Sequence, residues 1–185
     1  MTDRSATDTS EERGDPDRPT VVSIIGPSDA GKTSLVEALV SAFEDRRVAT
    51  VKSIHHDIEP DTPGTDTHRH RTAGADTVVG ITPAFTFEIT RGGKGSDRTD
   101  TATELAALGA TLDRLASRGF DIVLVEGFGA APLPTIRVGE GDGTATGAGT
   151  DPDPNRIGTG DESIGTLRAA IEDTDPVEPG TLPRR

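Results

Sequence analysis

Cysteine, tryptophan and tyrosine are absent from this 185-residue chain, and phenylalanine occurs only five times. Without cysteine the protein has no disulfide framework, no thiolate metal site and no cysteine nucleophile. No apolar run approaches the length of a membrane-spanning helix, and the N-terminus lacks the hydrophobic segment of a signal peptide. We therefore expect a cytoplasmic protein that does not engage a membrane.

Lysine is also scarce. Only Lys32, Lys52 and Lys94 occur, whereas aspartate and glutamate number 32 and the formal net charge is −13. An acidic surface repels a phosphate backbone, so this composition argues against a nucleic-acid partner. An acidic, lysine-poor chain rich in aspartate and threonine resembles the cytosolic proteins of extreme halophiles, where salt screens the repulsion between carboxylates. We expect a halophilic protein.

The segment Gly26-Pro27-Ser28-Asp29-Ala30-Gly31-Lys32-Thr33 matches G-x-x-x-x-G-K-[ST], the pattern of the phosphate-binding P-loop. A β-branched run at 20–25 predicts a buried strand before it, and an apolar stripe after it predicts an amphipathic helix to about residue 44. Lys32 is expected to reach the β- and γ-phosphates, and the Thr33 hydroxyl to ligate Mg²⁺. The expected triphosphate contacts come from Gly26, Ser28, Asp29, Ala30, Gly31, Lys32, Thr33 and Ser34.

Glu126 is the second candidate of the phosphate site. It follows the apolar run 122–125 and precedes Gly127, so it is expected to end a core strand. In P-loop proteins an acid at the end of a neighbouring strand holds Mg²⁺ directly or through water. Ligands in open α/β sheets gather at the carboxyl ends of the strands. We therefore assign Glu126 a catalytic or metal-binding role together with Thr33.

Beyond the phosphate site, the pattern predicts strands near 47–54, 76–82, 84–90 and 133–138 and helices near 66–73, 103–118 and 163–172. This alternation predicts an α/β fold of the three-layer P-loop NTPase kind with a mostly parallel sheet. The expected organisation is a disordered tail at 1–19, a nucleotide-binding domain at 20–138, a low-complexity linker at 139–161, and a short helix with a loose tail at 162–185.

All four histidines lie just after the second expected strand, among carboxylates and two arginines. Three interpretations stay open. The histidines with an aspartate could bind zinc, nickel or copper; the arginines could hold a phosphate while a histidine or aspartate orients a proton; or the segment is a charged surface loop. The candidate residues of this second site are His55, His56, Asp57, Arg69, His70 and Arg71.

Four runs in the chain resemble those of the MobB-type molybdopterin-guanine dinucleotide biosynthesis adaptor proteins. They are Thr50-Val51-Lys52 with His55-His56-Asp57, Asp61-x-Pro63-Gly64-x-Asp66, Arg69-His70-Arg71-x-Ala73-Gly74-Ala75, and Val123-Leu124-Val125-Glu126-Gly127-Phe128. The resemblance covers about residues 20–138. Departures are Ser53 in place of the family's usual histidine, Ile58 in place of phenylalanine, and Thr65 and Gly129 in place of lysines.

The resemblance implies a homodimeric P-loop protein that binds GTP with Mg²⁺ and is at most a weak GTPase. Such proteins assist the molybdenum cofactor guanylyltransferase that attaches GMP to Mo-molybdopterin. The loop carrying Asp57 would then lie near the pterin phosphate or the partner enzyme. Two other functions remain open from the residues alone: a P-loop kinase of a small metabolite with Asp57 as base, or a metallochaperone with a nucleotide switch.

Overall fold

A central parallel sheet organises the computed structural model, which describes residues 18–95, 100–139, 153–177 and 182. Its strand order is β2-β5-β1-β6-β7, and every neighbouring pair is parallel. The strands are β1 (Thr20–Ile25), β2 (Val48–Lys52), β5 (Ile122–Glu126), β6 (Thr135–Arg137) and β7 (Arg156–Thr159). The helices are α1 (Lys32–Ala42), α3 (Thr101–Ser117) and α4 (Ile164–Glu172).

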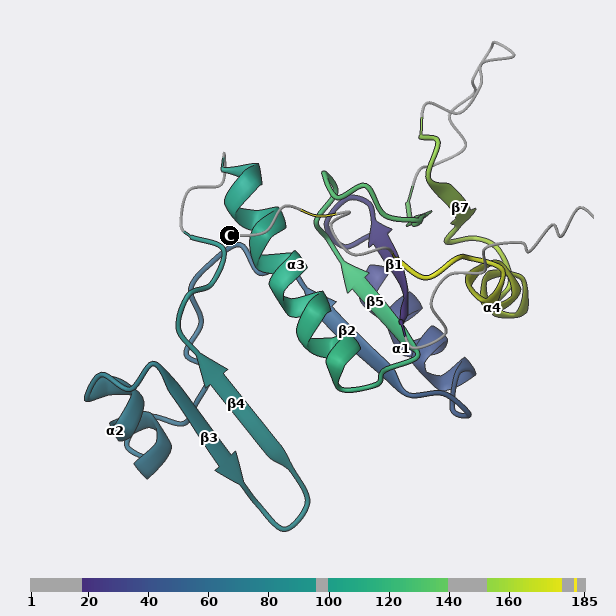
Figure 1. Ribbon diagram of the computed structural model, residues 1–185. Helices are drawn as coiled ribbons and strands as arrows, with labels where there is room; N and C mark the ends of the chain where they lie inside the picture. The colour runs from purple at the N-terminus through teal and green to yellow at the C-terminus, as the bar shows by residue number, and fades with distance from the viewer. Residues whose placement is uncertain (1–17, 96–99, 140–152, 178–181, 183–185) are drawn as a thin grey trace, which may run out of the picture.

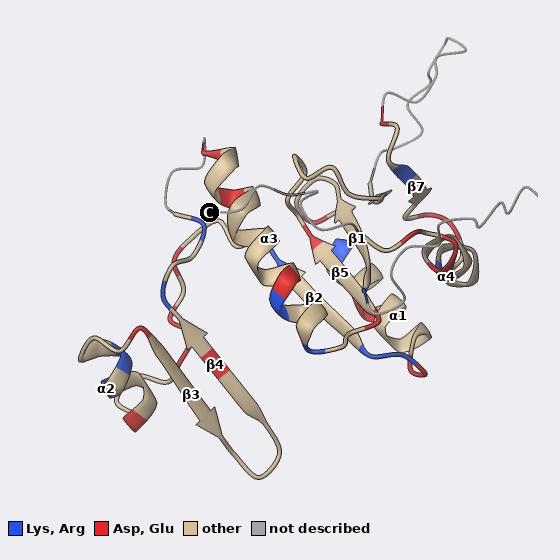
Figure 2. Cartoon of the chain, in the orientation of Figure 1, with Lys and Arg blue, Asp and Glu red and all other residues tan. Residues whose placement is uncertain are grey.

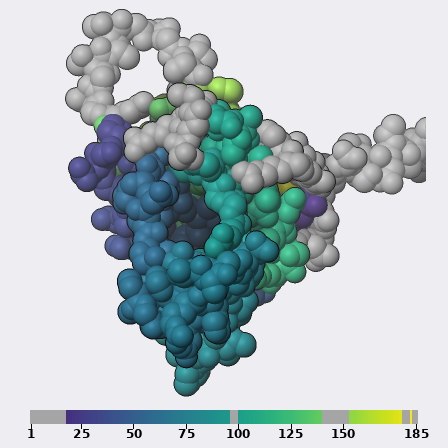
Figure 3. Space-filling model, turned by 90° about the vertical axis from the view of Figure 1, so that its left-hand side faces the viewer, coloured from purple at the N-terminus to yellow at the C-terminus, as the bar shows by residue number. Residues whose placement is uncertain are grey.

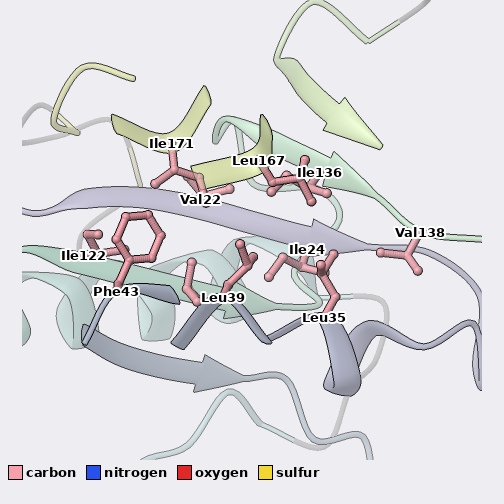
Figure 4. Close-up of a cluster of buried hydrophobic side chains, with 11 residues drawn as sticks. Val22, Ile24, Leu35, Leu39, Phe43, Ile122, Ile136, Val138, Leu167 and Ile171 are labelled. Atoms are coloured by element: carbon pink, nitrogen blue, oxygen red, sulfur yellow. The ribbon is translucent and has the colours of Figure 1, made fainter. Parts of the chain in front are cut away.

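Helices cover both faces of this sheet (Figure 1). Because successive side chains of a strand point to opposite faces, β1 contributes Val22 and Ile24 to one face and Val21 to the other. Figure 4 shows the first face, where Leu39 of α1, Phe43 just after that helix and two side chains of α4 close over the sheet. The second face packs against α3. The expected three-layer α/β fold with a parallel sheet is confirmed.

The carboxyl-terminal part differs from the expected organisation. Residues 156–159, expected as linker, form strand β7, which pairs in parallel with β6 at the edge of the sheet. Leu167 and Ile171 of α4 are fully buried against the sheet. The domain therefore does not end at residue 138, because β7 and α4 complete its core. The expected tail at 1–17 and residues 140–152 of the expected linker lie outside the described residues.

A smaller unit consists of α2 (Asp66–Thr72) and the antiparallel pair β3 (Thr77–Ile81) and β4 (Thr86–Thr90). Gly80 faces Phe87 across the pair, and a Cβ at Gly80 would lie 2.2 Å from the Phe87 ring. The absence of a side chain at this position therefore makes room for the aromatic ring. Both strands and the helix were expected at these places, and the structure adds that they form a separate sheet.

The smaller unit contacts the main body through ion pairs and leaves a hollow beside them. Glu88 of β4 pairs with Arg118 of α3 at 3.0 Å and with Arg114 at 3.5 Å. Figure 3 shows the hollow between the unit and the rest of the molecule. At the far end of the hairpin, Ile81 and Phe85 are 81% and 75% exposed. In the part of the chain that the structure describes, no helix combines the length and apolarity needed to cross a bilayer.

Candidate nucleotide site

The P-loop connects β1 to α1 at the carboxyl edge of the sheet. Gly26 has φ +150°, and a Cβ there would lie 2.1 Å from the carbonyl oxygen of Val138. Asp29 and Gly31 also have positive φ, +61° and +93°. No side chain caps the first turn of α1, whose N-cap is Gly31. The loop therefore presents uncapped backbone amides with the positive end of the helix dipole, an arrangement that favours an anion.

Lys32 is folded back onto the loop that carries it. Its Nζ donates a hydrogen bond to the carbonyl oxygen of Gly26 at 2.9 Å and another to that of Pro27. These carbonyls belong to the mouth of the P-loop, so the ammonium already lies at the site where phosphate is expected. The expected contact of Lys32 with the β- and γ-phosphates stays a prediction.

Glu126 and Thr33 meet, as the sequence predicted for a metal site. The Thr33 hydroxyl lies 3.3 Å from both carboxylate oxygens of Glu126. Glu126 ends β5 beside β1, and the backbone then turns sharply, because Gly127 and Phe128 both have positive φ. The Ser23 hydroxyl donates to the Gly127 carbonyl oxygen at 3.0 Å and fixes this turn. A hydroxyl and a carboxylate are hard oxygen donors, which fit Mg²⁺.

Lys52 completes this group. It is paired in register with Glu126 across β2 and β5, and its Nζ lies 2.8 Å from Glu126 Oε1 and 3.3 Å from Thr33 Oγ1. No sequence motif assigns Lys52 a role in the phosphate site. Two features of the sequence could have indicated such a role: lysine is scarce in this chain, and Lys52 stands at the end of a strand.

A second cluster adjoins the first through Ser53, whose backbone N–H donates to the Glu126 carbonyl oxygen at 2.9 Å. Lys94 donates to Ser53 Oγ and pairs with Glu104 of α3 at 2.8 Å, and its Nζ lies 3.3 Å from Nδ1 of His55. Burial alone would raise the pKa of Glu104, but hydrogen bonds from Lys94 and Ser53 outweigh it and lower the pKa. Ser53 thus joins the two clusters through polar contacts.

The arginines of the second candidate site lie elsewhere. Arg71 of α2 pairs with Glu59, and this hydrogen bond lowers the pKa of Glu59. Arg69 pairs with Asp66 at 3.5 Å on an exposed surface. Thr65 accepts from the His68 backbone N–H as the N-cap of α2. The arginines therefore do not join His55 beside Lys94.

The remaining second-site candidates are exposed: His56 and Asp57 lie in the loop after β2, and His70 lies on α2. Among the described residues no three histidine, aspartate or glutamate side chains approach closely enough to hold a metal ion. One of the three interpretations of the histidine segment was a metal site. The described residues do not form such a site.

All three lysines lie at the carboxyl edge of the sheet. Lys52 is the last residue of β2 and contacts Glu126, and Lys94 donates to Ser53, the residue that follows Lys52. Figure 2 shows that the charged residues of the large sheet lie mainly at the ends of its strands. In a chain with net charge −13 this edge gathers the ammonium groups. Lys52 and Lys94 are each paired with a carboxylate, whereas Lys32 donates to backbone carbonyl oxygens of the P-loop, where an anionic ligand is expected.

Comparison with one solved structure supports the fold. A crystal structure of Bacillus subtilis MobB covers 82% of this chain and 97% of its own, with a TM-score of 0.57 at 18% sequence identity. That likeness concerns the arrangement of the helices and strands. A MobB homolog from Bacillus stearothermophilus covers 64% of this chain at 25% identity, with a TM-score of 0.44.

Sequence comparison identifies the family. The chain is 34% identical over 111 residues to a putative molybdopterin-guanine dinucleotide biosynthesis adapter protein of Methanocaldococcus jannaschii. It is 32% identical over 118 residues to the corresponding adapter protein of Haemophilus influenzae. The matches cover 60% and 63% of this chain but only 42% and 61% of those relatives. The family model "Molybdopterin guanine dinucleotide synthesis protein B" matches residues 21–151, so the chain belongs to the MobB family.

Proposed function

We propose that this chain binds GTP with Mg²⁺ at the P-loop and assists a molybdenum cofactor guanylyltransferase in attaching GMP to Mo-molybdopterin. The observation that carries the proposal is the approach of Thr33 to both oxygens of Glu126 beside an uncapped P-loop, in a chain of the MobB family. The guanine preference and the partner come from the family to which the chain belongs.

The residues have separate roles in this proposal. The P-loop backbone from Gly26 to Ser34 would surround the phosphates, and Lys32 would exchange its carbonyl partners for phosphate oxygens. Thr33 and Glu126 would hold Mg²⁺, which when bound neutralises phosphate charge. A carboxylate at the end of β5 can also orient water, so any hydrolysis would be slow and would depend on Glu126. The exposed Asp57 loop would face the second ligand or the partner.

We expect the protein to bind a fluorescent GTP analogue about tenfold or more tightly than the matching ATP analogue, which corresponds to about 1.4 kcal/mol. The titration is run with Mg²⁺ in molar KCl, because the acidic composition predicts a need for screening. The control is the same titration in EDTA, where affinity should fall. Equal affinity for the two nucleotides, or no binding of GTP, would refute the nucleotide part.

We propose that the chain is a homodimer and that the hairpin β3–β4 forms part of the contact. Val79, Ile81 and Phe85 expose apolar surface at one end of the molecule, and this chain has very few aromatic residues. Exposed apolar side chains gathered on one hairpin mark an interaction surface. The pairing of β3 and β4 leaves further strand edges available for contact with a second copy.

Ile81→Asp should shift the protein from dimer to monomer, with the dimer dissociation constant rising about 100-fold, because a carboxylate would be buried in an apolar contact. Light scattering coupled to size-exclusion chromatography over a dilution series measures this constant. Val40→Asp is the matched control, since Val40 is an exposed apolar residue on α1, far from the hairpin in the fold. A monomeric wild type, or an unchanged constant in Ile81→Asp, contradicts the assignment.

A further inference from the structure

Lys52 occupies the position at which a metal ion would join Thr33 to Glu126. Its Nζ lies within 3.3 Å of Thr33 Oγ1 and 2.8 Å from Glu126 Oε1. These are the two side chains that we propose as ligands of Mg²⁺. The ammonium therefore makes the contacts that a divalent cation would make to the same oxygens.

The fold builds this arrangement into the sheet. Lys52 and Glu126 are paired in register on adjacent parallel strands, and the Ser53 N–H bonds to the Glu126 carbonyl oxygen just beyond them. The Glu126 side chain is 13% exposed, whereas that of Lys52 is 53% exposed. The carboxylate is thus held in place, while the lysine side chain is free to swing into solvent without disturbing the core.

A surface ion pair is the simpler explanation, and such a pair contributes little to stability. Two features of the Lys52 contacts are not explained by a surface ion pair alone. The ammonium contacts the Thr33 hydroxyl as well as the carboxylate, and it does so at the P-loop itself. Lys94, by contrast, pairs with Glu104 and Ser53 and has no contact with Thr33 among those that the structure describes. A cation positioned between both oxygen donors must leave before a second cation can bind them, because like charges repel.

We infer that Lys52 is a positioning residue that fills the cation site between Thr33 and Glu126 until metal and nucleotide arrive together. This inference rests on the proposed nucleotide function. In the free protein Lys52 satisfies Glu126 and opposes the binding of a divalent ion alone. A triphosphate brings enough negative charge to hold the metal and to draw the Lys52 ammonium away from the carboxylate. Metal and nucleotide binding are thereby coupled.

The test measures Mn²⁺ binding without nucleotide, from the electron paramagnetic resonance signal of free Mn²⁺. Lys52→Met removes the ammonium and keeps an unbranched side chain of similar length. We expect its Mn²⁺ affinity to be about tenfold or more higher than that of the wild type. Lys94→Met is the matched control, since it removes the same charge from the neighbouring cluster, and its affinity should stay within about twofold of the wild type.

Two further variants determine where the metal binds and whether the fold survives. Adding Glu126→Gln to Lys52→Met should abolish the gain, because the carboxylate ligand is lost. Lys52→Gln should reproduce the gain, and circular dichroism should show the wild-type helix content in each variant. Unchanged Mn²⁺ affinity in both folded Lys52 variants, or a gain that survives Glu126→Gln, overturns the inference.

This result is separable from the proposed function. If wild-type protein fails to bind GTP while Lys52→Met still gains Mn²⁺ affinity through Glu126, the nucleotide proposal fails and the competition for the cation site stands. If GTP binds with Mg²⁺ but the Lys52 variants leave Mn²⁺ affinity unchanged, the proposed function stands and Lys52 has no such role.

Discussion

Replacing Lys32 with alanine is expected to weaken GTP binding by at least about 100-fold, which corresponds to about 2.7 kcal/mol. The ammonium lies on the carbonyl oxygens of Gly26 and Pro27 at the mouth of the loop. Its loss removes the charge-assisted contact to the phosphates that no other P-loop side chain can supply. Isothermal titration calorimetry with Mg²⁺ and GTP measures the loss directly.

The matched control for this prediction is Lys94→Ala, which removes the same charge from the Glu104 and Ser53 cluster. Its GTP affinity should remain within a few-fold of the wild type. A functional assay extends the test: GMP transfer to molybdopterin by the partner transferase should be stimulated by the wild type and not by Lys32→Ala. Equal stimulation by both proteins would show that nucleotide binding is not part of the role.

Replacing Gly26 with alanine should cost about 3 kcal/mol or more of unfolding free energy. The new Cβ would lie 2.1 Å from the Val138 carbonyl oxygen, a backbone atom that no rotamer change can move aside. Relief requires the loop after β1 to separate from the end of β6. Because this loop is the P-loop, GTP binding should be lost together with stability.

Gly129→Ala is the control for the Gly26 variant. A Cβ at Gly129 meets no atom within 4 Å, and its φ is not in the left-handed region. The control should therefore unfold at nearly the wild-type denaturant concentration. Urea unfolding followed by far-ultraviolet circular dichroism gives both free energies. A Gly26→Ala protein as stable as the control would contradict the close approach of Gly26 to Val138.

Much of the fold could be predicted because its signals are local. The apolar run before Gly26 and the stripe on α1 identify β1 and α1, and Asp100, which accepts from the Thr103 N–H, caps α3. Strand β7 gave no such signal. Its four residues include one aliphatic side chain, and its buried member is Gly158, where Leu167 packs so closely that a Cβ would lie 2.6 Å away. Burial achieved by a missing side chain leaves no hydrophobic pattern.

In the candidate site, too, some residues could be predicted from local sequence patterns and others could not. Lys32, Thr33 and Glu126 could be predicted because each stands at a strand end or in the loop that follows one, and the ends of parallel strands share an edge. The Lys52–Glu126 contact depends on the strand order β2-β5-β1, in which β5 is the direct neighbour of β2. The contact of Lys94 with Glu104 depends on how a loop returns to α3. Neither follows from local sequence patterns.

The confinement of lysine to one edge of the molecule has a consequence for chemical handling. Amine-directed reagents, such as activated esters used for dye labelling, surface immobilisation or cross-linking, have no lysine target in this chain except Lys32, Lys52 and Lys94. Acylation of Lys32 or Lys52 would place a neutral, bulky group at the P-loop or beside Glu126. Protein coupled through Lys32 or Lys52 would thus lose its nucleotide site, and protection of these two lysines from acylation would report a bound nucleotide.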